Sequence, residues 1–234
     1  FPQVFLPPPP PSLKFCSLSS SSFTYPFFFT MVFDTLYHIF QHPWEEISLA
    51  SWRKYPNPTR PDVLSVDIIN RQFDPETGVL TATRLVTTDP RMPAFLTPIW
   101  SNAVVYCVEE SIVDPINKTM TLRSRNITGS SLMEVEEACH YSTEDGDFSR
   151  TNFRQDVNIR AHVFGLSGKI ESWTLSDFKQ KAVTGRVIME EAVTMIKKEA
   201  EEMEETLTTL KKEAGELLQE WQSNVQVLAD EDKE

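Results

Sequence analysis

The sequence predicts an α+β fold in which one antiparallel sheet packs against one long C-terminal helix. Three observations lead to this prediction. Strand-like runs follow one another across short turns such as residues 74–78 and 114–118, a spacing that favours an antiparallel meander. Residues 153–163 alternate apolar and polar side chains, as a half-buried strand does. From residue 183 onward apolar side chains recur every three or four positions, the period of an amphipathic helix.

Residues 1–30 differ in composition from the rest of the chain. They contain a five-proline run and a serine cluster, and the first methionine is Met31. Because proline neither donates to a sheet nor continues a helix, we expect this segment to be disordered or extended. It is either sequence upstream of a start at Met31 or a targeting extension. Presequences are rich in arginine, whereas Lys14 is the single cation here.

A β-prone run at residues 32–40 is followed by a short amphipathic helix at residues 42–55. Pro43 and two glutamates occupy the start of this helix, and Arg53 and Lys54 occupy its end, which complements the helix dipole. Prolines at positions 56 and 58 then terminate it. Five further strand candidates precede the alternating run, at residues 62–73, 78–88, 102–113, 118–126 and 132–141.

The segment at residues 89–102 interrupts the series of strands. It contains three prolines and is too apolar for a loop in solvent. We expect it either to pack as a short core helix or to cover something apolar. Its candidate lid residues are Met92, Pro93, Phe95, Leu96, Pro98, Ile99 and Trp100.

The long helix is expected to begin at a cap formed by Thr174 or Ser176. Its predicted buried stripe continues to residue 198 and consists of Val183, Val187, Ile188, Ala192, Met195 and Ile196. Residues 199–234 form an acidic tail, in which the apolar stripe thins. This tail is either a solvated helix or a coiled-coil arm.

Composition and motifs exclude several classes of function. The chain has a formal net charge of -12, so it lacks the uncompensated cations that nucleic-acid binding requires. We find no phosphate-binding glycine loop, no His-Glu-x-x-His and no Gly-x-Ser-x-Gly. The four histidines and three cysteines lack the spacing of metal ligands. We therefore expect no enzyme activity, catalytic residue, metal or cofactor.

A binding module remains as the hypothesis. A curved antiparallel sheet closed by a long helix can leave a cavity for a largely apolar ligand. Lys54, Arg84 and Arg91 are the candidate polar groups at its mouth. The alternative is an interaction protein with a filled core, which binds a partner through a sheet edge or through the acidic helix.

Four blocks of the sequence resemble a known family. "HPWEEISLASWRKYPNP", "LTATRLVTTDPRMP", "ESIVDPINKTM" and "LMEVEEACHY" are similar, in this order, to the PRELI family of mitochondrial lipid-transfer proteins, which includes the slowmo-type members. The resemblance spans residues 31–198. It implies a curved seven-stranded antiparallel sheet, a long C-terminal helix and a lid loop, which together enclose one phospholipid.

The resemblance also implies a function. The protein would shuttle an anionic phospholipid between mitochondrial membranes through the intermembrane space, with phosphatidic acid favoured and phosphatidylserine next. Its expected partners are the phospholipid, the membranes that it contacts transiently, and a small twin Cys-x9-Cys protein as heterodimer partner. Nucleic acid is not among them.

The headgroup site follows from the same resemblance. It assigns the headgroup to Lys54 and Arg84, with Arg91 at the base of the lid and Lys181 in the C-terminal helix, near Arg186. We add Arg53, next to Lys54, to this predicted set. Two positions that are basic in phosphatidic-acid-carrying relatives are Asp62 and Thr88 here, which counts against phosphatidic acid.

Overall fold

The structure is a computed structural model that describes residues 31–100, 104–144 and 147–231. The expectation for residues 1–30 lies outside these described residues. Within them, the predicted fold class is confirmed: a seven-stranded antiparallel sheet packs against a long C-terminal helix.

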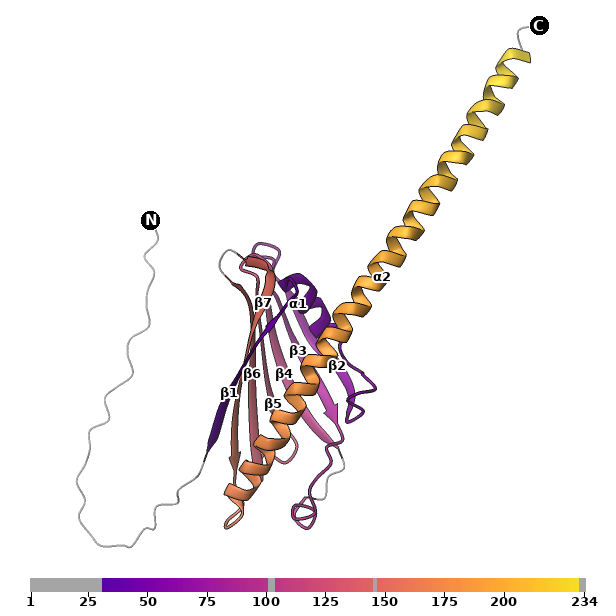
Figure 1. Cartoon of the computed structure of the whole chain (residues 1–234). Coiled ribbons are helices and arrows are strands. Elements are labelled where there is room, and N and C mark those ends of the chain that lie inside the picture. The colour runs from indigo at the N-terminus through magenta and orange to yellow at the C-terminus, as the bar shows by residue number, and fades with distance from the viewer. Residues whose placement is uncertain (1–30, 101–103, 145–146, 232–234) are drawn as a thin grey trace, which may run out of the picture.

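The sheet has the order β1-β7-β6-β5-β4-β3-β2. Strands β2 to β7 form a meander, while β1 and β2 lie at opposite edges because α1 connects them across the sheet (Figure 1). The strands are β1 (Val32–Phe40), β2 (Val63–Phe73), β3 (Leu80–Thr88), β4 (Val105–Asp114), β5 (Thr119–Asn126), β6 (Met133–Glu144) and β7 (Asp147–Ala161). All seven coincide with runs that the sequence predicts.

Aspartates build the two tight turns that the sequence predicts. The Asp74 carboxylate accepts the backbone N–H of Glu76 at 2.9 Å, and Gly78 supplies the left-handed residue of that turn with φ of 70°. Asp114 accepts the N–H of Asn117 at 2.9 Å in the second turn. These local hydrogen bonds stabilise the two turns through which β2 leads directly to β3 and β4 leads directly to β5.

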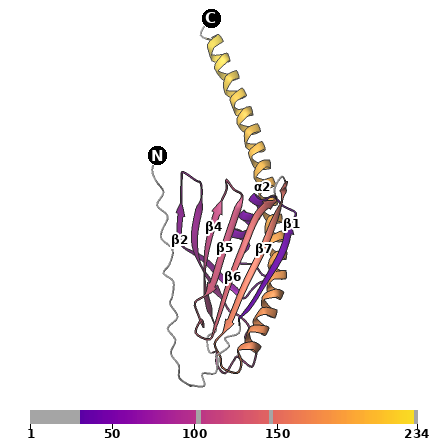
Figure 2. The same cartoon turned by 90° about the vertical axis from the view of Figure 1, so that its left-hand side faces the viewer.

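Both helices lie on the same face of the sheet, and the opposite face is left uncovered by them (Figure 2). α1 (Trp44–Arg53) has Pro43 at its N-cap and two acidic residues in its first turn, as the sequence predicts. α2 (Ser167–Glu231) crosses the sheet diagonally and continues beyond it (Figure 1).

The predicted start of α2 is wrong. The helix begins at Ser167 rather than at a cap formed by Thr174 or Ser176. Ile170, in its first turns, is buried in an apolar cluster together with Val157 and Ile159 of β7. This tertiary packing outweighs the low helix propensity of the Ser-Gly pair at residues 167–168.

The predicted buried face of α2 is partly wrong. Ile188 and Ala192 are buried as predicted, and Ile196 packs against the core. Val183, Val187 and Met195 are instead exposed. The face that meets the sheet is rotated, and from residue 182 onward its buried residues are Ala182, Ile188, Met189, Ala192 and Val193.

Two apolar clusters form the core. The first lies where α1 and α2 meet the sheet, and it includes Phe40, Ile47, Met120 and Val193. The second lies toward the start of α2, where Leu96 of the predicted lid joins residues of β6, β7 and the helix. Both clusters therefore lie between the helices and one face of the sheet.

Beyond the domain, α2 makes few contacts. Every described side chain from Lys197 to Gln222 is exposed. Arg53 of α1 pairs with Glu199 at 2.6 Å, at the point where the helix leaves the sheet. None of the described helices combines the length and apolar content that are needed to cross a bilayer.

The same substitution at two valines of α2 tests which face of the helix packs against the sheet. Val193→Ala should lower the free energy of unfolding by about 2 kcal/mol, because Val193 is 1% exposed in the core. Val187→Ala should change it by less than about 0.5 kcal/mol, because Val187 is 50% exposed. Urea unfolding measures both. Equal losses would contradict the observed face.

Deletion of residues 199–234 tests the division between domain and tail. Among the described residues, the deletion removes the exposed ion pairs Arg53–Glu199 and Lys198–Glu202. Together they are worth about 1 kcal/mol or less, so the melting temperature should fall by less than about 4 °C. Light scattering should give the same oligomeric state with and without the tail. A change of oligomeric state would identify a coiled-coil arm instead.

Candidate functional site

A cavity of ≈ 270 Å³ lies between the sheet and α2. Every strand and both helices contribute to its lining, together with the loop between α1 and β2. Apolar lining comes from residues such as Phe40, Val63, Leu122 and Phe178. The hollow that the sequence predicts is therefore present, although its lining is not purely apolar.

Cations are concentrated in this lining. Five cationic and two acidic side chains belong to it, although the whole chain has a formal net charge of -12. The cations are Lys54, Arg60, Arg84, Lys181 and Arg186, and the acids are Glu109 and Glu137. The cavity therefore has the opposite sign of charge to the protein as a whole.

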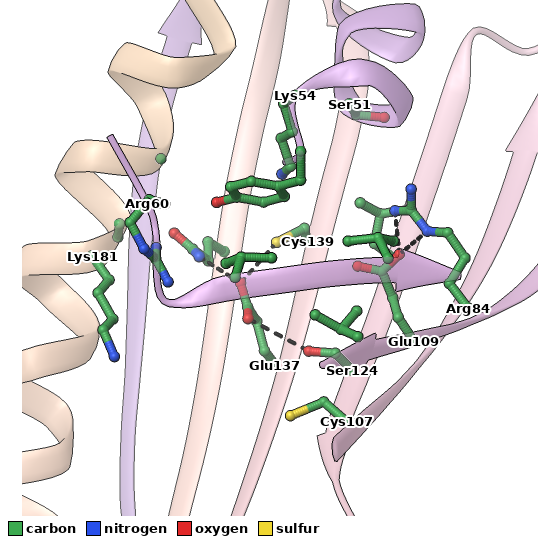
Figure 3. Close-up of a pocket in the computed structure, with 18 of the residues that line it drawn as sticks. Ser51, Lys54, Arg60, Arg84, Cys107, Glu109, Ser124, Glu137, Cys139 and Lys181 are labelled. Atoms are coloured by element: carbon green, nitrogen blue, oxygen red, sulfur yellow. Dashed lines mark hydrogen bonds and ion pairs between the residues drawn. The ribbon is translucent and has the colours of Figure 1, made fainter. Parts of the chain in front are cut away.

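Arg84 is buried and already neutralised. It lies on β3 directly opposite Glu109 of β4, and the two side chains lie side by side (Figure 3). The Arg84 Nε donates to Glu109 Oε1 at 2.7 Å, and Nη2 donates to the same oxygen. Its guanidinium carbon lies 4.5 Å from the ring centroid of Trp52. This pair positions Arg84 firmly and cancels its charge.

A second charged group forms on the side of α2. Arg60 donates to both carboxylate oxygens of Asp62, at 2.7 and 2.8 Å. Lys181 pairs with Asp177 at 2.8 Å and approaches Asp62 at 3.8 Å. Burial would raise the pKa of Asp62, but the hydrogen bond and the charge of Arg60 lower it below its usual range. Asp62 therefore stays ionised and neutralises Arg60.

Lys54 and Arg186 are the two lining cations left without a carboxylate. Among the described residues neither has an ion pair. Lys54 is the C-cap of α1, and its Nζ lies 5.4 Å from the ring centroid of Tyr55. It extends from the end of α1 into the cavity (Figure 3). These two cations are free to bind an anion.

Glu137 is held by neutral donors. Gln155 Nε2 donates to it at 2.6 Å, and the Cys139 thiol donates to it at 3.2 Å. Burial raises the pKa of the Cys107 thiol to about 11, and the charge of Glu137 adds to this shift. Both causes also raise the pKa of Cys139. The cavity thiols are therefore protonated and weakly nucleophilic at neutral pH.

The structure brings together only some of the predicted headgroup residues. Lys54, Arg84 and Lys181 line the cavity. Arg91 is exposed and lies in an adjoining groove that also includes Lys181. Arg53 lies outside the cavity lining, since its guanidinium pairs with Glu199.

The lid segment packs beside the cavity rather than over it. It forms turns, not the short core helix that was one of the two expectations, and it covers an apolar cluster. Leu96 and Trp100 are buried, whereas Pro98 and Ile99 are exposed. Phe95 meets Trp173 of α2 edge to face, with ring centroids 6.4 Å apart.

Sequence reasoning did not place the acids Glu109 and Glu137 in the cavity. Alternation along β4 contained the signal, because Val105 and Ser111 are buried and Glu109 shares their face. Alternation along β6 likewise places Glu137 on the face of buried Cys139. Neither was assigned to the cavity, because acidic residues seldom lie inside a cavity that is expected to be apolar.

The comparison with known proteins decides the family. The PRELI-like family matches this chain over residues 45–200, which is most of the described domain. The chain belongs to the PRELI-like family. Its match includes α1, all strands from β2 to β7 and the docked part of α2.

Two individual relatives of the PRELI-like chain support this family assignment. It is 39% identical to a slowmo homolog from Dictyostelium discoideum over 171 residues, covering 73% of this chain and 75% of the relative. It is 33% identical to the mitochondrial PRELI domain-containing protein 1 of Gallus gallus, covering 69% and 76%. A solved START superfamily protein from Mycobacterium smegmatis aligns with TM-score 0.41 and 13% identity, covering 67% of this chain and 96% of that one.

Two glycines test how the lid of this PRELI-like domain is held. A Cβ on Gly129 would lie 2.0 Å from the Trp100 ring, whereas one on Gly165 would meet nothing within 4 Å. Both have positive φ, so each Gly→Ala change should cost about 1 to 2 kcal/mol of stability. Gly129→Ala should cost at least about 1 kcal/mol more, because Trp100 must move. It should also make residues 89–100 more sensitive to protease. Equal behaviour of the two variants would contradict this contact.

Proposed function

We propose that this protein extracts a single anionic phospholipid from a membrane and carries it between mitochondrial membranes, with phosphatidic acid or phosphatidylserine as the ligand. The observation that carries the proposal is a cavity in which, among the described residues, Lys54 and Arg186 have no carboxylate partner. Membership of the PRELI-like family supports it. Relatives that are named mitochondrial support the location, and we place the protein in the intermembrane space.

The acyl chains explain why the ligand must be enclosed. Two chains of about 16 carbons contain roughly 30 methylenes, whose exposure to water would cost on the order of 20 kcal/mol. A carrier lowers this barrier by offering apolar lining such as Leu122 and Phe153. The headgroup needs the opposite environment, with charge-assisted donors that replace its lost hydration.

Lys54 and Arg186 supply these donors from two different elements, the end of α1 and the N-terminal third of α2. A phosphate bound to both would connect the two helices. Lys181 lies near them, with its charge shared between Asp177 and Asp62. Arg84 is already bonded to Glu109, and we do not assign it to the headgroup.

Uptake requires the domain to open. The cavity of ≈ 270 Å³ lies below the range of about 300 to 1,000 Å³ that is usual for drug-sized ligands, and a two-chain phospholipid is larger than these. The lid is the segment suited to move, because Leu96 and Phe95 pack on the neighbouring apolar cluster without a strand to hold them. Acyl chains can take the place of these side chains.

The cavity is suited to carriage without chemistry. None of the four described histidines lines it, and its thiols are protonated at neutral pH. The cavity also argues against the alternative of an interaction protein with a filled core. A small twin Cys-x9-Cys protein remains the proposed heterodimer partner, and the edges of β1 and β2 are open to it.

Substitution of Lys54 and of its neighbour Arg53 tests whether Lys54 binds the headgroup. Lys54→Gln should reduce transfer of phosphatidic acid and phosphatidylserine between vesicles about tenfold or more, because a charge-assisted hydrogen bond is lost. Arg53→Gln is the control, since Arg53 pairs with Glu199 outside the cavity, and it should stay within about twofold of wild type. Equal transfer by both variants would rule out Lys54 as a headgroup ligand.

A further inference from the structure

The pairing of charges in the cavity leaves a small positive excess. Three of its five cations are bonded to carboxylates, as described above for Arg84, Arg60 and Lys181. Lys54 and Arg186 remain, and they are offset by the carboxylate of Glu137, whose donors are neutral groups. The excess is therefore about one positive charge.

We propose that Glu109 is the resident counter-ion of Arg84, and that it thereby sets the cavity to a headgroup with one net negative charge. The inference rests on the proposed function and assigns to Glu109 a positioning and specificity role. It differs from the expectation drawn from the sequence, in which Arg84 binds the headgroup directly.

The geometry fixes Glu109 in this role. Glu109 and Arg84 face each other across adjacent strands, so the distance between their backbones is set by the sheet itself. The Trp52 ring covers the guanidinium, and Arg84 is only 4% exposed. Solvent therefore screens the attraction between the two charges only weakly.

Removal of Glu109 would change what the cavity binds. Arg84 would then be a buried cation without a partner, and a ligand phosphate would be the nearest group able to neutralise it. Within the described chain, its Nη1 group has no hydrogen-bond partner and could donate to such a ligand. The cavity would then favour a headgroup with two negative charges.

Two soluble lipids of different charge test this inference. Dihexanoyl phosphatidic acid is a monoester that carries nearly two negative charges at pH 8, whereas dihexanoyl phosphatidylglycerol is a diester that carries one. Titration calorimetry on the full chain gives the ratio of their affinities. Glu109→Gln should shift this ratio toward phosphatidic acid by about tenfold or more relative to wild type.

Two further variants show whether a shifted affinity ratio comes from loss of the Arg84–Glu109 pair or only from loss of one negative charge. Glu110→Gln alters the next residue of β4, which lies outside the cavity lining, and it should leave the ratio unchanged. The double variant Arg84→Gln/Glu109→Gln removes a pair that is already neutral. It should keep both affinities within about threefold of wild type, and it avoids an unpaired buried charge if Glu109→Gln fails to fold.

Each outcome decides the matter. A shifted ratio in Glu109→Gln, or wild-type affinities in the double variant where the single variant does not fold, supports the inference. If Glu109→Gln folds and its affinity ratio is unshifted, the counter-ion role of Glu109 is overturned. Binding of the lipids by the wild-type protein would still support the proposed function. A tenfold loss of both affinities in the double variant also overturns it, because Arg84 would then bind the headgroup itself. Wild-type protein that binds neither lipid overturns the function and the role together.

Discussion

A cation can stay inside a hollow that excludes water only if another group neutralises it, and the pairing of Arg84 with Glu109 meets this constraint. The pair connects β3 to β4 beneath Trp52, where the sheet and α1 approach each other. Together with the ion pairs of Arg60 and Lys181, it explains how the cavity holds five cations with an excess of only about one positive charge.

The two helices place further cavity residues in the layer between themselves and the sheet. α1 carries the chain from one edge of the sheet to the other, and its end places Lys54 over the cavity. α2 lines one side of the cavity with Phe178, Ala182 and Gly185, and it contributes Arg186. The two cations without carboxylates thus come from the end of α1 and from α2. The neutralised cations, Arg84, Arg60 and Lys181, come from β3, from the loop before β2 and from α2.

Much of the fold could be predicted because it depends on local chemistry. Alternation in β7, the aspartate turns at residues 74 and 114, and Pro43 at the start of α1 all act within a few residues. The rotation of α2 could not be predicted, because Val187 and Val193 are equally apolar and only packing against the sheet separates them. The ion pairing of the cavity cations could not be predicted either. Which cations are neutralised depends on register between strands, and no single strand contains that information.

The central claim is that the layer between sheet and helices holds one anionic phospholipid. Mass spectrometry of the full chain, purified gently from cells and kept in its folded state, tests this most directly. We expect one phospholipid per protein, with an anionic headgroup that is released when the protein unfolds. Protein that is persistently free of phospholipid under these conditions, while folded and monodisperse, would contradict the claim.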